Sequence, residues 1–168
     1  MQAVQPQPVQ PLANLLSIKA KTFLVIDASV SIPQPMFEAL SRRAIALTVN
    51  GQHNAFQLVS STLQQHPTIN SLHLFTRSHD GEIRLGKHVL DARTTEQHSW
   101  DLQEWFSFAN HHLSFKRPKI HIHMNSPVNS PVSLTETADL APSMINPAVI
   151  DMLSQLTGAE VIVLETLQ

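Results

Sequence analysis

Five short apolar segments recur along the chain and constrain its fold more than any other feature. They are TFLVI from Thr22, AIALTV from Ala44, SLHLFT from Ser71, IHIHM from Ile120 and EVIVL from Glu160. Such runs are typical of strands buried on both faces, as in a parallel sheet. Segments with helical spacing lie between them, at residues 36–43, 55–65, about 94–112 and 148–156. The alternation predicts a three-layer α/β/α sandwich with a mostly parallel sheet and helices on both faces.

The segment after the third predicted strand departs from this alternation. EIRLG and KHVLD, residues 82–91, are short and joined at Gly86 and Lys87, so they predict a short β-hairpin. Thr94 or Thr95 is expected to cap a long helix that reaches about His112. The apolar side of that helix is expected to hold Trp100, Leu102, Trp105, Phe106 and Phe108. Gly158 is expected to end the last helix as its carboxyl cap.

The start of the chain differs in composition from the rest. Residues 1–21 are rich in Gln and Pro, which predicts a disordered or extended leader before a single domain over residues 22–168. The first eighteen residues carry no Lys or Arg and are interrupted by Pro6, Pro8 and Pro11. A conventional signal peptide is therefore not expected.

Charge and cysteine content exclude several classes of protein. Eleven basic and thirteen acidic residues give a net charge of -2, and no Lys/Arg cluster is available to neutralise phosphates. Nucleic-acid binding is therefore not expected. The chain has no cysteine, which excludes disulfides, thiolate zinc sites, iron–sulfur clusters and a cysteine nucleophile. No uncharged apolar run approaches the length of a membrane span. No cofactor is expected either.

Three motifs occur in an order that resembles a known family. They are IDASV after the first strand, GEIRLG in the hairpin and LTGAEV before the last strand. Together with the spacing from Thr22 to Leu164, they resemble domain of unknown function 4347, a bacterial domain often found near the amino terminus of very large repeat-rich surface proteins. The resemblance implies a caspase-like fold.

The sequence departs from that family at its peptidase-like signature. Members typically carry Ser-His-Gly after the third strand and Gly-Cys after the fourth. Counting from the shared motifs, the histidine position falls on Arg77, the following glycine on Ser78 and the cysteine on Asn125. An amide nitrogen cannot replace a thiolate nucleophile. The resemblance therefore implies a degenerate member without cysteine-peptidase chemistry, and no catalytic residue is assigned.

Three histidines are candidates for a metal site. His121 and His123 are two residues apart on one predicted strand and so share a face, and His73 lies on the neighbouring strand. Two imidazoles at that spacing can share a metal, and with a third ligand from His79 or Asp80 the site would suit zinc or another transition metal. The alternative is that His121 and His123 are half-buried strand residues that form hydrogen bonds to nearby helices. Because no sharper motif such as HExxH accompanies them, we favour the alternative.

Polar residues also gather at the carboxyl ends of the predicted strands, where open α/β sheets bind ligands. They are Asp27, Arg77, His79, Asp80, His123, Asn125 and Ser126. A hydrolase built from Ser126, His79 and Asp27 is conceivable, but no G-x-S-x-G motif supports it. A vestigial pocket for a peptide or small ligand is the stronger functional interpretation, and a purely structural edge is the simplest one.

These observations favour a non-catalytic interaction or assembly module. Only 14% of the residues are charged, so much of the surface is neutral and inexpensive to desolvate against a protein partner or a second copy. Export to the cell surface by a route independent of a signal peptide is one expectation, and a cytoplasmic location the other. The alternative function is a histidine-based metal-binding protein or metal-dependent hydrolase.

Overall fold

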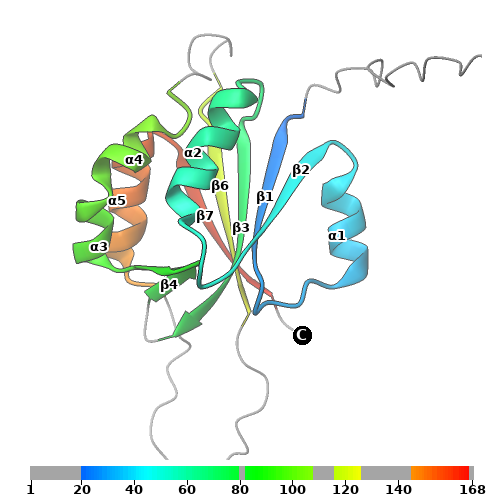
Figure 1. Ribbon diagram of the computed structural model, residues 1–168, viewed down its shortest axis with the longest axis horizontal. Helices are drawn as coiled ribbons and strands as arrows, with labels where there is room; N and C mark the ends of the chain where they lie inside the picture. The colour runs from blue at the N-terminus through cyan, green and yellow to red at the C-terminus, as the bar shows by residue number, and fades with distance from the viewer. Residues whose placement is uncertain (1–19, 80–81, 108–115, 126–144, 167–168) are drawn as a thin grey trace, which may run out of the picture.

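The central feature of the fold is a parallel sheet of five strands. The computed structural model describes residues 20–79, 82–107, 116–125 and 145–166. The strands are β1 (Thr22–Asp27), β2 (Ala44–Val49), β3 (Ser71–His79), β6 (Lys119–Asn125) and β7 (Glu160–Thr166). They pair in the order β2-β1-β3-β6-β7, all parallel (Figure 1). The predicted α/β fold class is confirmed.

Helices flank this sheet unequally. They are α1 (Gln34–Ser41), α2 (Ala55–Gln65), α3 (Ala92–Gln97), α4 (Ser99–Glu104) and α5 (Pro147–Thr157). Figure 1 shows α1 on one side of the sheet and the other four helices on the opposite side. Right-handed crossovers explain this division. The connection from β1 to β2 runs in one direction across the sheet, and the later connections run in the other.

The main hydrophobic core lies between the sheet and the four helices. Alternate residues of each strand point to this side, because successive side chains in a strand face opposite ways. The strands contribute Phe23, Val25, Leu72, Leu74, Ile120 and Ile122, and the helices contribute Phe56, Val59, Val149 and Leu153. α1 begins two residues earlier than the sequence predicted and contributes no fully buried residue.

The predicted hairpin is confirmed as β4 (Glu82–Leu85) and β5 (His88–Leu90), which pair antiparallel. Gly86 joins them with a positive φ of 61°. β4 also pairs with Ser78 and His79, so β3 continues three residues beyond its predicted end. Strand pairing beyond the main sheet therefore lengthens β3, which no local pattern in β3 indicates.

The long helix predicted from Thr94 or Thr95 is wrong. Asp91 is the amino cap of α3, and its carboxylate accepts a hydrogen bond from Thr94 N at 2.7 Å. The segment then divides at His98 into α3 and α4.

The exposure of Trp100 is the clearest consequence of the division into α3 and α4. It is 83% exposed and not on the apolar side as predicted, whereas Leu102, Trp105 and Phe106 are buried as expected. Phe108 and His112 lie outside the described residues.

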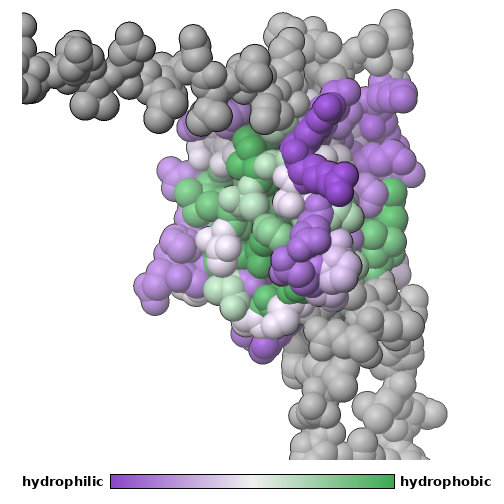
Figure 2. Space-filling model, turned by 90° about the vertical axis from the view of Figure 1, so that its right-hand side faces the viewer, coloured by the Kyte–Doolittle hydropathy of each residue, from purple (hydrophilic) through white to green (hydrophobic). Residues whose placement is uncertain are grey.

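The sheet face on the α1 side carries a second, smaller group of side chains. Leu24 and Phe75 are fully buried there, and His73 and His123 are nearly so. Figure 2, viewed from the α1 side, shows a hydrophobic area bordered by polar residues. No described helix has the length and hydrophobicity needed to cross a membrane.

Candidate functional site

The carboxyl edge of the sheet connects β1 to β3 through polar contacts. Asp27, at the end of β1, is buried, and its carboxylate accepts hydrogen bonds from the backbone N–H of Ser29, at 2.9 Å, and from the Ser29 hydroxyl. The Arg77 guanidinium, at the end of β3, donates to the Ser29 carbonyl oxygen. The predicted edge residues Asp27 and Arg77 are thus brought together through Ser29, which the sequence analysis did not include.

Arg77 and Asn125 are register partners on the adjacent strands β3 and β6. The two positions that the resemblance assigned to a catalytic pair therefore lie side by side, although the chain has neither the histidine nor the cysteine there. The side chains of Asn125 and His79, together with Asp80 and Ser126, lie outside the described part of the chain. The hydrolase of Ser126, His79 and Asp27 and the complete vestigial pocket therefore stay predictions.

The three candidate histidines form one cluster on the α1 side of the sheet. His73 and His121 are register partners on β3 and β6, and their rings stack with centroids 4.4 Å apart. His73 Nδ1 lies 2.9 Å from His123 Nε2, and the two share a hydrogen bond. His73 Nε2 lies 3.1 Å from Ser71 Oγ. The ring of Phe75 stacks on that of His123 at 4.3 Å.

Burial makes these imidazoles hard to protonate. It lowers the pKa of His73 to about 4, with a further contribution from repulsion by His121 and His123. Burial and repulsion by His121 lower the pKa of His123 to about 4 as well. The pKa of His121 is also lowered, by burial and then by Lys119, while Glu160 opposes this change. The cluster is therefore neutral at neutral pH.

The contacts differ from the interpretation favoured at the sequence level. His73 and His123 form hydrogen bonds to each other and to a serine of the same sheet, not to nearby helices. Among the described residues, no group of three His, Cys, Asp or Glu side chains is arranged to hold a metal ion. The third ligand proposed from His79 or Asp80 lies outside the part for which side chains are described.

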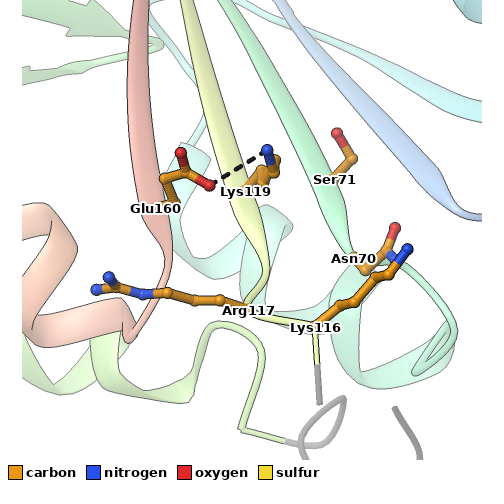
Figure 3. A pocket seen from close by; sticks show the side chains of 6 residues that line it. All are labelled: Asn70, Ser71, Lys116, Arg117, Lys119 and Glu160. Carbon is orange, nitrogen blue, oxygen red and sulfur yellow. Dashed lines mark ion pairs between the residues drawn. The ribbon is translucent and has the colours of Figure 1, made fainter. Parts of the chain in front are cut away.

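A hollow of about 360 Å³ lies at the other edge of the sheet (Figure 3). It is lined by Asn70, Ser71, Lys116, Arg117, Lys119 and Glu160. Lys119 Nζ forms an ion pair with Glu160 at 3.2 Å, and the Arg117 guanidinium donates to Gly158 O and Ser154 Oγ. Ser71, Lys119 and Glu160 are neighbours in register on β3, β6 and β7.

The sequence did not predict this hollow, because its lining residues lie at the amino ends of β3, β6 and β7 and in the segments just before β3 and β6. Ser71 and His73 are two residues apart on one strand, which indicates a shared face. That spacing was the one feature of the sequence that indicated a contact between Ser71 and His73. The proximity of Lys119 and Glu160 depends on strand order, which the sequence does not display.

Comparison with known families supports the resemblance seen in the sequence. No curated protein matches the chain significantly. A family model described as Domain of unknown function (DUF4347) matches residues 23–117, more than half of the chain. The match includes Arg77 and the hairpin, whereas Asn125, α5 and β7 lie beyond it. The chain therefore belongs to the DUF4347 family, a family of unknown function.

Proposed function

We propose that this domain is an assembly module without cysteine-peptidase chemistry, in which two copies associate through the outer edge of β7. The observation that carries the proposal is the character of that edge. β7 is the last strand of the sheet, and no described strand pairs with its outer side. It is seven residues long, above the typical strand length of five to six.

Exposed edges normally carry features that prevent pairing with another chain. Charged residues, proline, bulges or a short strand are the usual ones. Residues 161–164 of β7, with the sequence VIVL, contain neither a charge nor a proline, and the charged Glu160 and Glu165 lie toward the ends. The central part of β7 therefore remains able to form a backbone ladder.

The sequence of β7 is also compatible with pairing to itself. In an antiparallel pair centred on Val163, Ile162 would face Leu164 of the second copy, and Val161 would face Glu165. Glu160 would face Thr166, so no two carboxylates lie directly opposite each other. A two-fold contact of this kind is the usual way in which identical subunits associate.

The side chains near this edge add apolar area to the backbone ladder. Leu164 is 39% exposed and Ile162 is partly exposed on the α1 side of the sheet. Pairing across the edge would cover part of both side chains with cross-strand neighbours and add hydrophobic stabilisation. Because few charges need to be desolvated, little of this gain is lost.

The carboxyl edge supports the absence of cysteine-peptidase chemistry. Arg77 and Asn125 lie where the family resemblance places a histidine and a cysteine, and the chain contains no thiol. Neither a guanidinium nor an amide can act as the nucleophile of a cysteine peptidase. No hydrolysis of unstructured peptides through Arg77 or Asn125 is therefore expected.

Analytical ultracentrifugation of the full chain tests the assembly. We expect a concentration-dependent dimer for the parent chain and a monomer for the double variant Ile162→Lys, Leu164→Lys, because lysines on an edge oppose strand pairing. Trp100→Lys is the matched control. It places a lysine at another large hydrophobic residue that is exposed, on α4, and should leave the dimer intact.

Two outcomes would overturn the proposal. One is a parent chain that remains monomeric at every concentration tested. The other is a dimer that persists in a correctly folded double variant, because association would then use another surface. Circular dichroism of each variant establishes that it has the parent fold.

A further inference from the structure

We propose that Ser71, His73 and His123 form an acyl-transfer relay, in which the Ser71 hydroxyl attacks activated esters that carry a negative charge. The site lies on the α1 side of the sheet, at the hollow lined by Ser71, and is separate from the carboxyl edge.

The relay rests on two contacts. Ser71 Oγ lies 3.1 Å from His73 Nε2, which places a hydroxyl next to a base. His73 Nδ1 lies 2.9 Å from His123 Nε2, which fixes the orientation of the His73 ring. A nucleophile within reach of a base that is itself held by a third group is the arrangement that activates a hydroxyl. The proposed relay requires the proton of His73 on Nδ1, where it is donated to His123 Nε2, and His123 is then a positioning residue.

The surroundings of Ser71 favour an anionic substrate. Lys119 is the register neighbour of Ser71, and Lys116 and Arg117 line the same hollow, against one carboxylate from Glu160. An ester whose acyl group bears a carboxylate matches this charge distribution.

Water is the second substrate of the proposed reaction. The Ser71 oxygen forms a bond to the acyl carbon as its proton passes to His73 Nε2. The bond from that carbon to the leaving oxygen then breaks, and the leaving group takes the proton from His73. Water, deprotonated by His73, attacks the acyl-serine, releases the acid and returns the proton to Ser71.

The environment of His73 limits the reaction to reactive substrates. Burial lowers the pKa of His73 to about 4, so the ring is unprotonated at neutral pH, as a base must be. A weak base gives little driving force for proton transfer. Aryl esters, whose leaving groups are good, are therefore accepted, and amides are not.

Mass spectrometry of the full chain treated with p-nitrophenyl esters tests the relay. We expect an acyl adduct on Ser71, located by peptide mass on the unmodified sequence, so that the result does not require any variant to fold. The mono-p-nitrophenyl ester of succinate should acylate Ser71 faster than p-nitrophenyl acetate does. The absence of an adduct on Ser71 with either ester would overturn the proposal. Equal acylation rates for the two esters would contradict the preference for a negatively charged acyl group.

Variants test whether His73 activates the Ser71 hydroxyl or whether that hydroxyl reacts only because it is exposed. His73→Gln should slow acylation of Ser71 about 100-fold, because the base is lost. Ser61→Ala is the matched control, since the Ser61 hydroxyl donates to Leu58 O within α2, and its removal should leave acylation of Ser71 unchanged. An unchanged acylation rate in folded His73→Gln would contradict the role of His73.

The role of His123 is tested by two replacements with opposite properties. His123→Gln retains an oxygen that can accept from His73 Nδ1, and His123→Phe retains the ring shape without an acceptor. If His123 positions His73, the Gln variant should acylate faster than the Phe variant. The reverse order would show that His123 only fills space.

Discussion

At the scale of single residues, Gly86 shows how a backbone contact dictates a residue type. Its φ is 61°, and a Cβ added there would lie 2.8 Å from His53 O and 3.1 Å from Asn50 O. Both neighbours are backbone atoms, which cannot move aside as the end of a side chain can. We therefore expect Gly86→Ala to lower the free energy of unfolding by about 2 kcal/mol, measured by urea denaturation.

Gly51 provides the control for this prediction. A Cβ added at Gly51 meets no heavy atom within 4 Å. Gly51→Ala should therefore change the free energy of unfolding by less than about 0.5 kcal/mol. If the two variants lose the same free energy of unfolding, the close approach of Gly86 to the 50–53 turn is not the cause of the loss in Gly86→Ala.

At the scale of elements, α1 differs from the other helices. It has no fully buried residue, whereas α2 and α5 place Phe56, Val59, Val149 and Leu153 in the main core. Local opening costs little where few apolar contacts are lost. We expect the amides of α1 to exchange with deuterium well before those of α5, as measured by mass spectrometry of peptides. Equal protection of α1 and α5 would contradict this view of the α1 side.

Local sequence patterns predicted the strands of the parallel sheet, because these strands are buried as continuous apolar runs. The continuous apolar runs gave all five parallel strands, and Gly158 caps α5 in the left-handed conformation as expected. The division of the helix at His98 was not predicted, because the Asp91–Thr94 capping box moves the helix start and the apolar spacing continues across the break. Trp100 was consequently assigned to the core and lies in solvent.

The candidate sites were predictable in part. Strand periodicity indicated that His121 and His123 share a face and that His73 lies nearby, as the structure confirms. The partners of these rings depend on register and on side-chain conformation, which one sequence does not encode locally. The same limit hid the hollow, whose residues Ser71, Lys119 and Glu160 come from three separate strands.

At the scale of the whole molecule, the buried imidazoles couple stability to pH. Unfolded histidines titrate near pH 6.5, whereas burial lowers the pKa of His73 and of His123 to about 4. Between these values the unfolded chain binds more protons than the folded one, so acid favours unfolding. This contribution to stability is complete above about pH 6.5, falls as the pH decreases toward 4, and is constant below it.

The loss at pH 5 relative to pH 8 amounts to about 2 kcal/mol for each of the two imidazoles. For a chain of this length, the melting temperature should fall by on the order of 10 °C, measured by differential scanning calorimetry across that range. His123→Gln should make the decrease shallower, because one titrating group is removed and His73 loses the repulsion from His123. His66→Gln, at an exposed position after α2, should leave the decrease unchanged. If His66→Gln flattens the curve as much as His123→Gln does, the pH dependence arises at the surface and not in the cluster.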